Sequence, residues 1–329
     1  MHKFSYEWTL GAANFTRDKG TVFSCFACGG GSSLGYKLAG FDVLGCNEID
    51  PKMIEAYTAN NHPKYAFLEP IQDFKNRDDL PEELYNLDIL DGSPPCSTFS
   101  MAGNREKDWG KEKKFREGQA EQVLDTLFFD FIDLANKLQP KVVIAENVKG
   151  LLIGGAKAYV ARIYEEFDKA GYYLQHWLLD SAYMGVPQKR ERVFFIGMRK
   201  DLAKPFLERI DLFTMAPGLN LAFNEPVIPI GLFAKGIPKR TTQNYSKKRY
   251  GDVMLNVNKP SNTITTDINR YWLDENTLID DETKMKIGSY PLDYDFCNNN
   301  PQYLIGMSVP PVMVAQVASR IYKQWLSKI

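Results

Sequence analysis

Strand-like and helix-like segments alternate up to about residue 200, and this alternation constrains the fold more than any other feature of the chain. Parallel strands need long crossover connections, which are usually helices, whereas antiparallel strands can be joined by short turns. We therefore expect an α/β fold: a mostly parallel sheet with helices on both faces. The strand-like runs are 21–27, 42–50, 88–96 and 141–148, followed by a hairpin-like pair within 172–198.

Two amphipathic helices frame the expected domain organisation. A helix near 121–138 presents apolar residues with i, i+3, i+4 spacing, from Val123 and Leu124 to Leu138. A helix at 312–327 has one apolar stripe that packs most simply on the first domain. Prolines interrupt the segment between them, where the helical period is lost. We expect a catalytic domain of residues 1–199 and 289–329 and a small, loop-rich domain of residues 200–288.

Composition places the chain among globular proteins of the cytosol. Hydrophobic residues make up 44% and charged residues 25% of the sequence. The first residues have no apolar core of signal-peptide length, and no run is long enough to cross a bilayer. The five cysteines are odd in number and irregularly spaced, which suits reduced thiols. Cys25 and Cys28 form a CxxC pair without a second pair, so no metal site is expected.

Charge gives only a local indication of a nucleic-acid partner. The formal net charge is −1, but residues 226–251 contain six basic residues and no acidic one. A phosphate backbone would favour such a segment, although a solvated surface has the same composition. The basic residues are Lys235, Lys239, Arg240, Lys247, Lys248 and Arg249.

The turn after the first strand, FACGGG, has the composition of a ligand-binding corner. Its glycines place backbone without side chains where a ligand must approach closely. Glu48 ends the second strand, where a carboxylate accepts hydrogen bonds from the ribose hydroxyls of an adenosine cofactor. A dinucleotide-binding dehydrogenase fits this pattern too, although the turn lacks the GxGxxG spacing. A tight strand-to-helix corner without a ligand is the other interpretation.

Cys96 lies in SPPCSTFS, directly after a buried strand. Open α/β sheets bind their ligands at this carboxyl edge, and two prolines fix where the sulfur points. A cysteine there can be buried filler, a metal ligand or a nucleophile. The Pro-Pro turn and the edge position favour a nucleophile.

Two further segments carry charged residues beside strands, and the first of them ends at the edge expected for Cys96. IAENV places Glu146 and Asn147 at the end of a strand, where a partly desolvated carboxyl could hold a proton near neutral pH. Such a carboxylate could equally cap a backbone amide. QKRERVFFIG puts Arg190 and Arg192 on one face of a strand, or on a solvated hairpin.

Taken together and in this order, these segments resemble the DNA (cytosine-5) methyltransferases. The similarity rests on FACGGG, NEID, GSPPCSTFS, AENV and QKRERVFFIG, and resumes with PSNTITTD and IGMSVPP. It covers residues 21–198 and extends from about 259 to the end. The resemblance implies a Rossmann-like S-adenosylmethionine-dependent methyltransferase sheet with a small target-recognition domain.

The family's mechanism assigns a role to each matching residue. Cys96 would add to carbon 6 of cytosine, Glu146 would protonate the ring, and Arg192 would bind the carbonyl oxygen, with Arg190 supporting the site. The cytosine must be flipped out of the duplex. The resemblance places the cofactor against Phe26, Cys28, Gly29, Gly31, Glu48, Ile49, Ile71, Pro95, Leu127 and Ser308.

DNA contacts are expected from a further set of residues. Residues 103–119 form a candidate lid, and the recognition segment is 200–258. Duplex DNA is the expected partner, with a cognate restriction endonuclease as a candidate second one and a monomer as the expected state. Two positions depart from the family: Pro70, beside Glu69, and Met307 stand where an Asp and an Asn are usual. The expected DNA-contact residues are Ser100, Arg190, Lys239, Arg240, Lys247, Lys248 and Arg249.

Four other functions remain open at this point. A tRNA cytosine-5 methyltransferase of the same fold would share every motif. An amino-methyltransferase can use an SPP turn, but an aromatic residue is expected where Cys96 stands. A binding module without turnover would not need Cys96, Glu146 and Arg192 together. A nicotinamide dehydrogenase is disfavoured by the glycine spacing.

Overall fold

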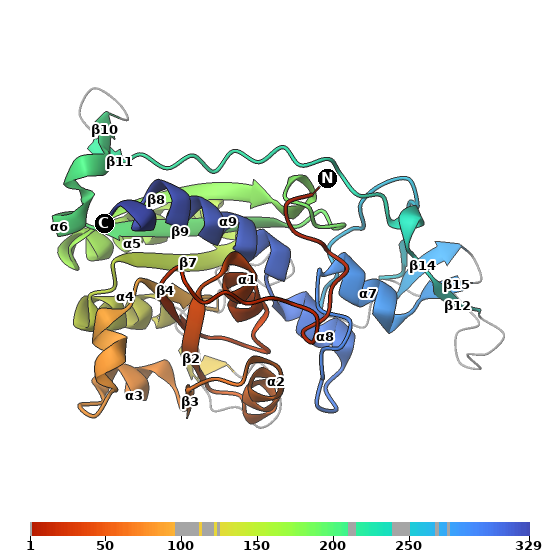
Figure 1. Ribbon diagram of the computed structural model, residues 1–329, viewed down its shortest axis with the longest axis horizontal. Coiled ribbons are helices and arrows are strands. Elements are labelled where there is room, and N and C mark those ends of the chain that lie inside the picture. Colours follow the sequence, from red (N-terminus) through yellow and green to blue (C-terminus); the bar gives the residue numbers. More distant parts are fainter. Residues whose placement is uncertain are drawn as a thin grey trace.

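The structure is a computed structural model, and its main feature is a seven-stranded sheet (Figure 1). It describes residues 2–95, 112–113, 122–123, 126–209, 215–238, 251–266, 270–274 and 277–329. The strand order is β3-β2-β1-β4-β7-β9-β8. The strands are β1 (Thr21–Cys25), β2 (Asp42–Glu48), β3 (Tyr65–Leu68), β4 (Ile89–Gly92), β7 (Val142–Val148), β8 (Tyr172–Asp180) and β9 (Glu191–Arg199).

The pairing confirms a mostly parallel sheet. From β3 to β7 all neighbours are parallel, while β9 is antiparallel to both β7 and β8. The hairpin expected within 172–198 is this β8–β9 pair. The register between β7 and β9 sets Glu146 opposite Phe194 and Val148 opposite Arg192. The start of β9 therefore lies at the same edge as the ends of β1, β4 and β7.

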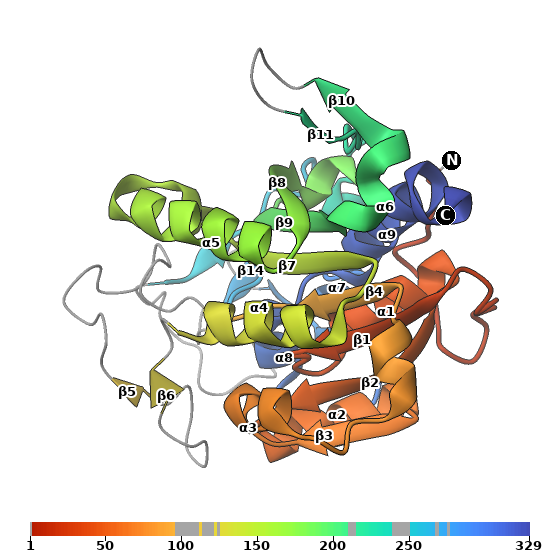
Figure 2. The ribbon, with the colours of Figure 1, turned by 90° about the vertical axis from the view of Figure 1, so that its left-hand side faces the viewer.

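Helices cover both faces of the sheet, as expected (Figure 2). On one face Phe23, Val143 and Phe195 pack under α3, α4 and α5. Their neighbours Val22, Ile144 and Ile196 face α1 and α9 on the other. The central strands β1, β4 and β7 are buried on both faces, which explains their apolar sequences. The helices are α1 (Gly31–Ala39), α2 (Pro51–Asn61), α3 (Ile71–Asn76), α4 (Leu127–Leu138), α5 (Lys157–Lys169), α6 (Lys200–Ala203), α7 (Asp281–Ile287), α8 (Pro301–Met307) and α9 (Pro311–Gln324).

The helix expected over 121–138 begins later than the sequence pattern predicted. α4 starts at Leu127, and Val123 instead belongs to a two-residue strand, β6 (Gln122–Val123), that pairs with β5 (Glu112–Lys113). Leu124 lies outside the described residues, as does most of the candidate lid 103–119. The apolar spacing continued across the boundary, so periodicity alone could not locate the first turn.

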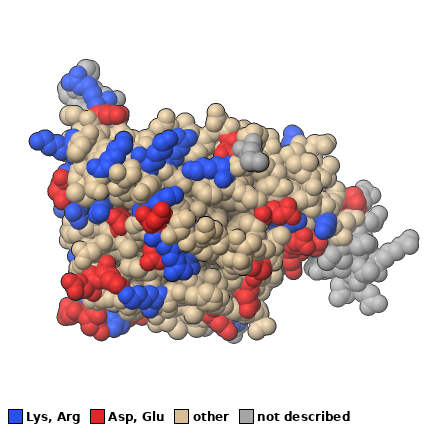
Figure 3. Space-filling view, viewed as in Figure 1, with Lys and Arg blue, Asp and Glu red and all other residues tan. Residues whose placement is uncertain are grey.

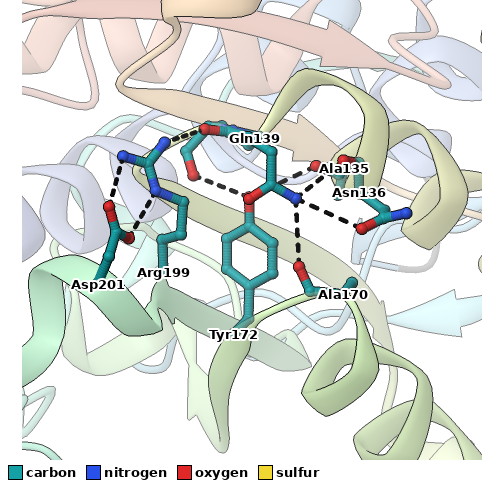
Figure 4. A network of polar contacts seen from close by, with 8 residues as sticks. Ala135, Asn136, Gln139, Ala170, Tyr172, Arg199 and Asp201 are labelled. Atoms are coloured by element: carbon teal, nitrogen blue, oxygen red, sulfur yellow. Dashed lines mark hydrogen bonds and ion pairs between the residues drawn. The ribbon is translucent and has the colours of Figure 1, made fainter.

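A polar network fixes the edge of the sheet where the parallel strands begin (Figure 4). Tyr172 donates a hydrogen bond of 2.8 Å to the Pro140 carbonyl, and Gln139 donates one of 3.2 Å to the Ala170 carbonyl. Arg199 forms an ion pair of 2.7 Å with Asp201 and also donates to the Gln139 carbonyl. These bonds join the end of α4 to β8 and β9. The opposite edge is left for loops and ligands.

A second, smaller sheet lies beyond α7 and α8 (Figure 1). Its order is β12-β15-β14-β13, and its core is shared with Leu34 and Ile305 of the main domain. Residues 200–221, in contrast, pack on the main sheet: Ala203 and Leu221 belong to the core under α9. The remaining strands are β10 (Leu207–Arg209), β11 (Met215–Pro217), β12 (Gly236–Pro238), β13 (Val253–Met254), β14 (Tyr271–Asp274) and β15 (Thr277–Ile279).

The two ends of the chain both pack against this framework. The N-terminal segment reaches the α7 region, where Trp8 donates a hydrogen bond of 2.9 Å to the Ser289 carbonyl and Glu7 pairs with Lys286 at 2.7 Å. The expectation that no run is long enough to cross a bilayer does not hold for the stretch 301–328, which is long and apolar enough by length and composition alone. Its most apolar window is 83% buried inside the protein, as expected for α9 packing on α1. The apolar stripe predicted for the last helix is thereby confirmed.

Candidate active site

A pocket opens where β1, β2 and β4 end, with about 670 Å³ of space that is partly open to solvent. Seven of the ten residues expected to contact a cofactor line it: Phe26, Cys28, Glu48, Ile49, Ile71, Pro95 and Leu127. The other lining residues are Asn47, Asp50, Met53, Glu69, Ser93, Tyr303 and Met307.

The Glu48 side chain is held in the wall of this pocket by backbone hydrogen bonds. Its carboxylate accepts hydrogen bonds from the backbone N–H groups of Cys28 at 2.7 Å and of Ile49 and Asp50 at 2.9 Å each. Burial raises the pKa of Glu48, and these backbone bonds oppose the rise. A carboxylate has about four acceptor sites, so about one remains for a ligand hydroxyl.

The turn after β1 adopts a backbone conformation that non-glycine residues rarely take. Phe26 has a φ of 52° and Cys28 a φ of 48°. Both residues line the pocket, and the bond from the Cys28 N–H to Glu48 holds the turn in place. Left-handed backbone at such residues costs about 1–3 kcal/mol, and it clusters at ligand sites.

The glycines of this turn also meet a packing requirement. A Cβ at Gly29 would overlap Leu304, and one at Gly31 would lie 2.9 Å from the Ser308 Cβ and 3.0 Å from the Tyr290 hydroxyl. The space that these glycines leave is therefore filled by α8 and its neighbours. Gly29, Gly31 and Ser308 are not among the residues that line the pocket, and their expected contact with a cofactor stays a prediction.

The charge of the pocket limits the ligands it can hold. Glu48, Asp50 and Glu69 lie in its wall, and no Lys, Arg or His is among its lining residues in the described part of the chain. Phe26, Ile49 and Leu127 provide apolar surface. Such a wall attracts a cation with an apolar body and repels a pyrophosphate.

A buried ion pair lies at the same edge of the sheet, on β7 and β9. The Arg192 Nε is 2.8 Å from the Glu146 Oε1, and Glu146 is only 8% exposed. Burial lowers the pKa of Arg192, while Glu146 acts in the opposite direction. The pair confines both side chains to one orientation. The ion pair places Glu146 and Arg192 side by side, and their roles toward a base stay a prediction.

Asn147 connects this pair to the segment that carries Cys96. Its Nδ2 donates a hydrogen bond of 3.1 Å to the Pro94 carbonyl, and its Oδ1 accepts one of 2.8 Å from the Val148 N–H. Pro94 therefore lies at the end of β7, next to Glu146, while Ser93 and Pro95 line the pocket. Cys96 itself lies outside the described residues.

Arg190 joins three separate segments behind the ion pair. Its guanidinium donates to the Ile264 carbonyl at 3.1 Å and to the Gly306 carbonyl at 2.8 Å, and the residue is 2% exposed. Burial and the neighbouring Arg192 lower its pKa well below the ordinary value. A Cβ at Gly306 would lie 2.6 Å from the backbone of Thr265. The QKRER, TITT and IGMS segments therefore pack against one another, with Arg190 between them.

The remaining expectations and omissions have identifiable reasons. Pro70 begins α3 as its N-cap, Glu69 pairs with Arg77 at 3.2 Å, and Met307 lines the pocket. Asn47, Asp50 and Ser93 were missed although they flank the motif residues. Met53 and Tyr303 carry no sequence signal. Ser100, Lys239, Arg240, Lys247, Lys248 and Arg249 lie outside the described residues.

Comparison with known proteins gives consistent matches. The sequence profile described as C-5 cytosine-specific DNA methylase matches residues 20–269. The Type II methyltransferase M.FnuDI of Fusobacterium nucleatum is 36% identical over 181 residues, which are 55% of this chain and 47% of that protein. The match thus spans about half of that relative. M.NgoFVII of Neisseria gonorrhoeae is 27% identical over 94% of this chain and 88% of its own length.

A solved structure shares the whole architecture. A protein described as a DNA modification methyltransferase encoded within an E. coli prophage superimposes with a TM-score of 0.65. The superposition covers 92% of this chain and 99% of that one, at 18% sequence identity. At this identity the likeness concerns the fold.

Proposed function

Because this chain belongs to the C-5 cytosine-specific DNA methylase family, we propose that it methylates carbon 5 of cytosine in duplex DNA, with S-adenosylmethionine as donor. The observation that carries the proposal is the acidic, partly apolar pocket directly beside the Pro94–Pro95 turn and the Glu146–Arg192 pair. A sulfonium cofactor matches the three carboxylates of the wall, whereas a nicotinamide dinucleotide would bring two phosphates to them.

The described residues fit this donor. Glu48 has an acceptor site left for a ribose hydroxyl, and Phe26, Ile49 and Ile71 provide apolar surface for a purine. Glu69 is the carboxyl nearest in sequence to Pro70, and it lines the pocket. We assign to Glu69 the role in adenine binding that the family's usual Asp would have at position 70. When bound, the cofactor supplies a methyl group activated by the positive charge of its sulfur.

The catalytic steps follow from the residues at the sheet edge. The Cys96 thiolate forms a bond to carbon 6 of the cytosine, while Glu146 protonates nitrogen 3 and the ring becomes an enamine. Arg192 stabilises the carbonyl oxygen of the base. Carbon 5 then takes the methyl group, loses its proton to a base, and the bond to Cys96 breaks. Asn147 and Arg190 position these groups.

The target cytosine reaches this site only after it leaves the duplex, which costs a few kcal/mol. The face that carries α1 and α9 shows basic and acidic side chains intermixed (Figure 3), so it presents no single sign of charge to DNA. We assign the phosphate contacts to the basic residues 239–249 of the second domain. A cognate endonuclease, a monomeric state and a cytoplasmic location are parts of the same proposal.

Substrate choice is the first measurement that tests it. Incubated with labelled cofactor, the protein is expected to methylate duplex DNA at least about tenfold faster than tRNA, because the second domain would read base edges in the major groove. The product cytosines should resist bisulfite conversion. Faster methylation of tRNA would favour the tRNA enzyme of the same fold, and a bisulfite-sensitive product would exclude carbon 5.

The salt dependence of DNA binding tests the basic segment. Replacing Lys247 and Lys248 by Gln should reduce the slope of log affinity against log salt concentration by about 2, because each lost phosphate contact removes about one released counterion. Replacing Lys204 and Lys328 by Gln is the matched control, since both are exposed and lie outside the segment 239–249. An equal effect of both double variants would remove 239–249 from the interface.

A further inference from the structure

Asp91 is a fully buried carboxyl that the proposed chemistry does not use. It lies on β4, two residues before Ser93 in the pocket wall, and is 4% exposed. Its carboxylate accepts hydrogen bonds from the Tyr36 hydroxyl at 2.9 Å and from the Ser24 hydroxyl at 3.1 Å. Its hydrogen-bond partners in the described structure are thus hydroxyl groups, and burial raises the pKa of Asp91 to about 7.

A chain of buried hydroxyl groups extends from Asp91 through the main domain. Ser33 lies 3.1 Å from Ser24 and 2.9 Å from the Tyr57 hydroxyl, which lies 3.4 Å from the Gly45 carbonyl. Ser24, Ser33 and Tyr57 are each 0% exposed. The chain connects β4, β1, α1, α2 and β2 in turn.

The elements it connects are the ones that build the candidate site. β4 leads directly into the Ser93–Pro95 turn before Cys96, and α1 begins at Gly31, at the end of the glycine turn. α2 contributes Met53 to the pocket. The hydroxyl chain therefore lies beneath both the nucleophile segment and the cofactor pocket, and it joins them through side-chain hydroxyls and, on β2, the Gly45 carbonyl.

The chain can satisfy its donors in either protonation state of Asp91. With a carboxylate, Ser33 donates to Ser24 and Ser24 donates to Asp91. With a carboxylic acid, the proton of Asp91 points to Ser24, and the donors reverse through Ser33 and Tyr57 to the Gly45 carbonyl. No buried hydroxyl is left without an acceptor in either case, which avoids the penalty of an unsatisfied group.

We propose that Asp91 is a positioning residue that holds the strand leading to Cys96 against the turn and helix that form the cofactor pocket. The inference rests on the proposed methyltransferase function and deepens it. Asp91 touches neither substrate nor cofactor, and acts through Ser24 and Tyr36. The titratable groups around it are Glu146 on β7, Cys25 on β1, Tyr36 on α1 and Tyr57 on α2.

Three variants of the full chain test the proposal. Asp91→Ala should raise the dissociation constant of S-adenosylhomocysteine about tenfold and lower kcat, because it removes two hydrogen bonds that orient the pocket. Asp91→Asn should restore most of both, since its amide can accept from Tyr36 and donate to Ser24. Asp88→Asn is the matched control: Asp88 accepts from the Thr21 N–H at 2.7 Å at the opposite end of β4, away from the pocket.

The outcomes separate this proposal from the function on which it rests. Unchanged binding and kcat in a folded Asp91→Ala variant would overturn it, and so would an equal loss in Asp88→Asn. If Asp91→Ala does not fold, Tyr36→Phe removes one of the two bonds and should weaken binding in the same direction; unchanged binding there would also overturn it. Absence of DNA methylation by the wild-type protein would overturn the proposed function, while analogue binding still tests Asp91.

The pH dependence of stability gives an independent readout of Asp91. The folded-state pKa of about 7 lies above the ordinary value of 3.8, so the stabilisation is present below pH 4 and is lost as pH rises through 7. The Asp91→Asn variant keeps this stabilisation at every pH, because an amide does not ionise. The Tm of the Asn variant minus that of wild type should therefore increase by roughly 5–10 °C between pH 4 and pH 8. A constant difference would show that Asp91 keeps one protonation state.

Discussion

Replacing Cys96 by Ser is expected to lower turnover on the order of 10³-fold or more while leaving cofactor affinity nearly unchanged. A thiol with an ordinary pKa near 8.5 provides some thiolate at neutral pH, whereas a serine hydroxyl provides almost no alkoxide. The bond to carbon 6 of cytosine would then form too slowly to activate carbon 5. The described pocket wall contains Ser93, Pro95, the turn after β1 and the end of β2, so the dissociation constant of S-adenosylhomocysteine should change less than about twofold.

A substrate analogue gives the sharper measurement for Cys96. In DNA with 5-fluorocytosine at the target, carbon 5 carries fluorine instead of hydrogen, so no proton can be removed after methyl transfer and the bond to the thiol persists. Wild-type protein should form a complex that survives denaturation, and Cys96→Ser should form none. Near-normal turnover of the variant, or a trapped complex without Cys96, would remove the covalent mechanism.

The fold could be predicted because its elements carry strong local patterns. The apolar run of β7 is buried on both faces, and the stripe Val314, Val317 and Ile321 of α9 packs where an amphipathic helix must. The start of α4 could not be predicted, because the apolar spacing begins at Val123 while the backbone there pairs with Glu112–Lys113. A tertiary pairing across the intervening residues overrides the helical period, and sequence spacing does not contain it.

The candidate site could be predicted where a residue type and its place at a strand end coincide. Glu48 and Glu146 both end strands, and both lie at the same edge in the structure. The contributions of Met53 and Tyr303 depend on how α2 and α8 pack around the pocket, which no local pattern encodes. Gly29 is also a packing position, because a Cβ there would overlap Leu304, and its contact with a cofactor stays a prediction.

The hydroxyl chain shows why a buried polar network is hard to read from sequence. Ser24, Ser33, Tyr57 and Asp91 are of ordinary types, lie on four different elements and have no common spacing. Asp91 sits within the strand-like run 88–96, where a charged residue looks like a defect in an apolar pattern. Only the packing of α1 and α2 against the sheet explains how a carboxyl is accommodated there.

Replacing Glu146 by Gln is expected to lower kcat by about 10²–10⁴-fold, the usual effect of removing a general acid. The Gln amide keeps the shape of the carboxyl, and its oxygen can still accept a hydrogen bond from the Arg192 Nε. In the wild-type protein this nitrogen lies 2.8 Å from the Glu146 Oε1. It has no acidic proton for nitrogen 3, so it cannot neutralise the ring as Cys96 adds.

The same substitution should weaken DNA binding much less than it slows chemistry. The bond from Glu146 to the base strengthens as charge builds up on the ring, so its loss is felt mainly in the transition state. The matched control is Glu191→Gln, since Glu191 pairs with Lys149 at 3.0 Å beside Arg192 but is partly exposed. Single-turnover rates and DNA dissociation constants measured for both variants separate the two effects. If Glu146→Gln lowered the rate and the DNA affinity by the same factor, Glu146 would act in docking alone. If Glu191→Gln lowered the rate as much as Glu146→Gln does, the loss would come from the negative charge at this edge of the sheet and not from Glu146 itself.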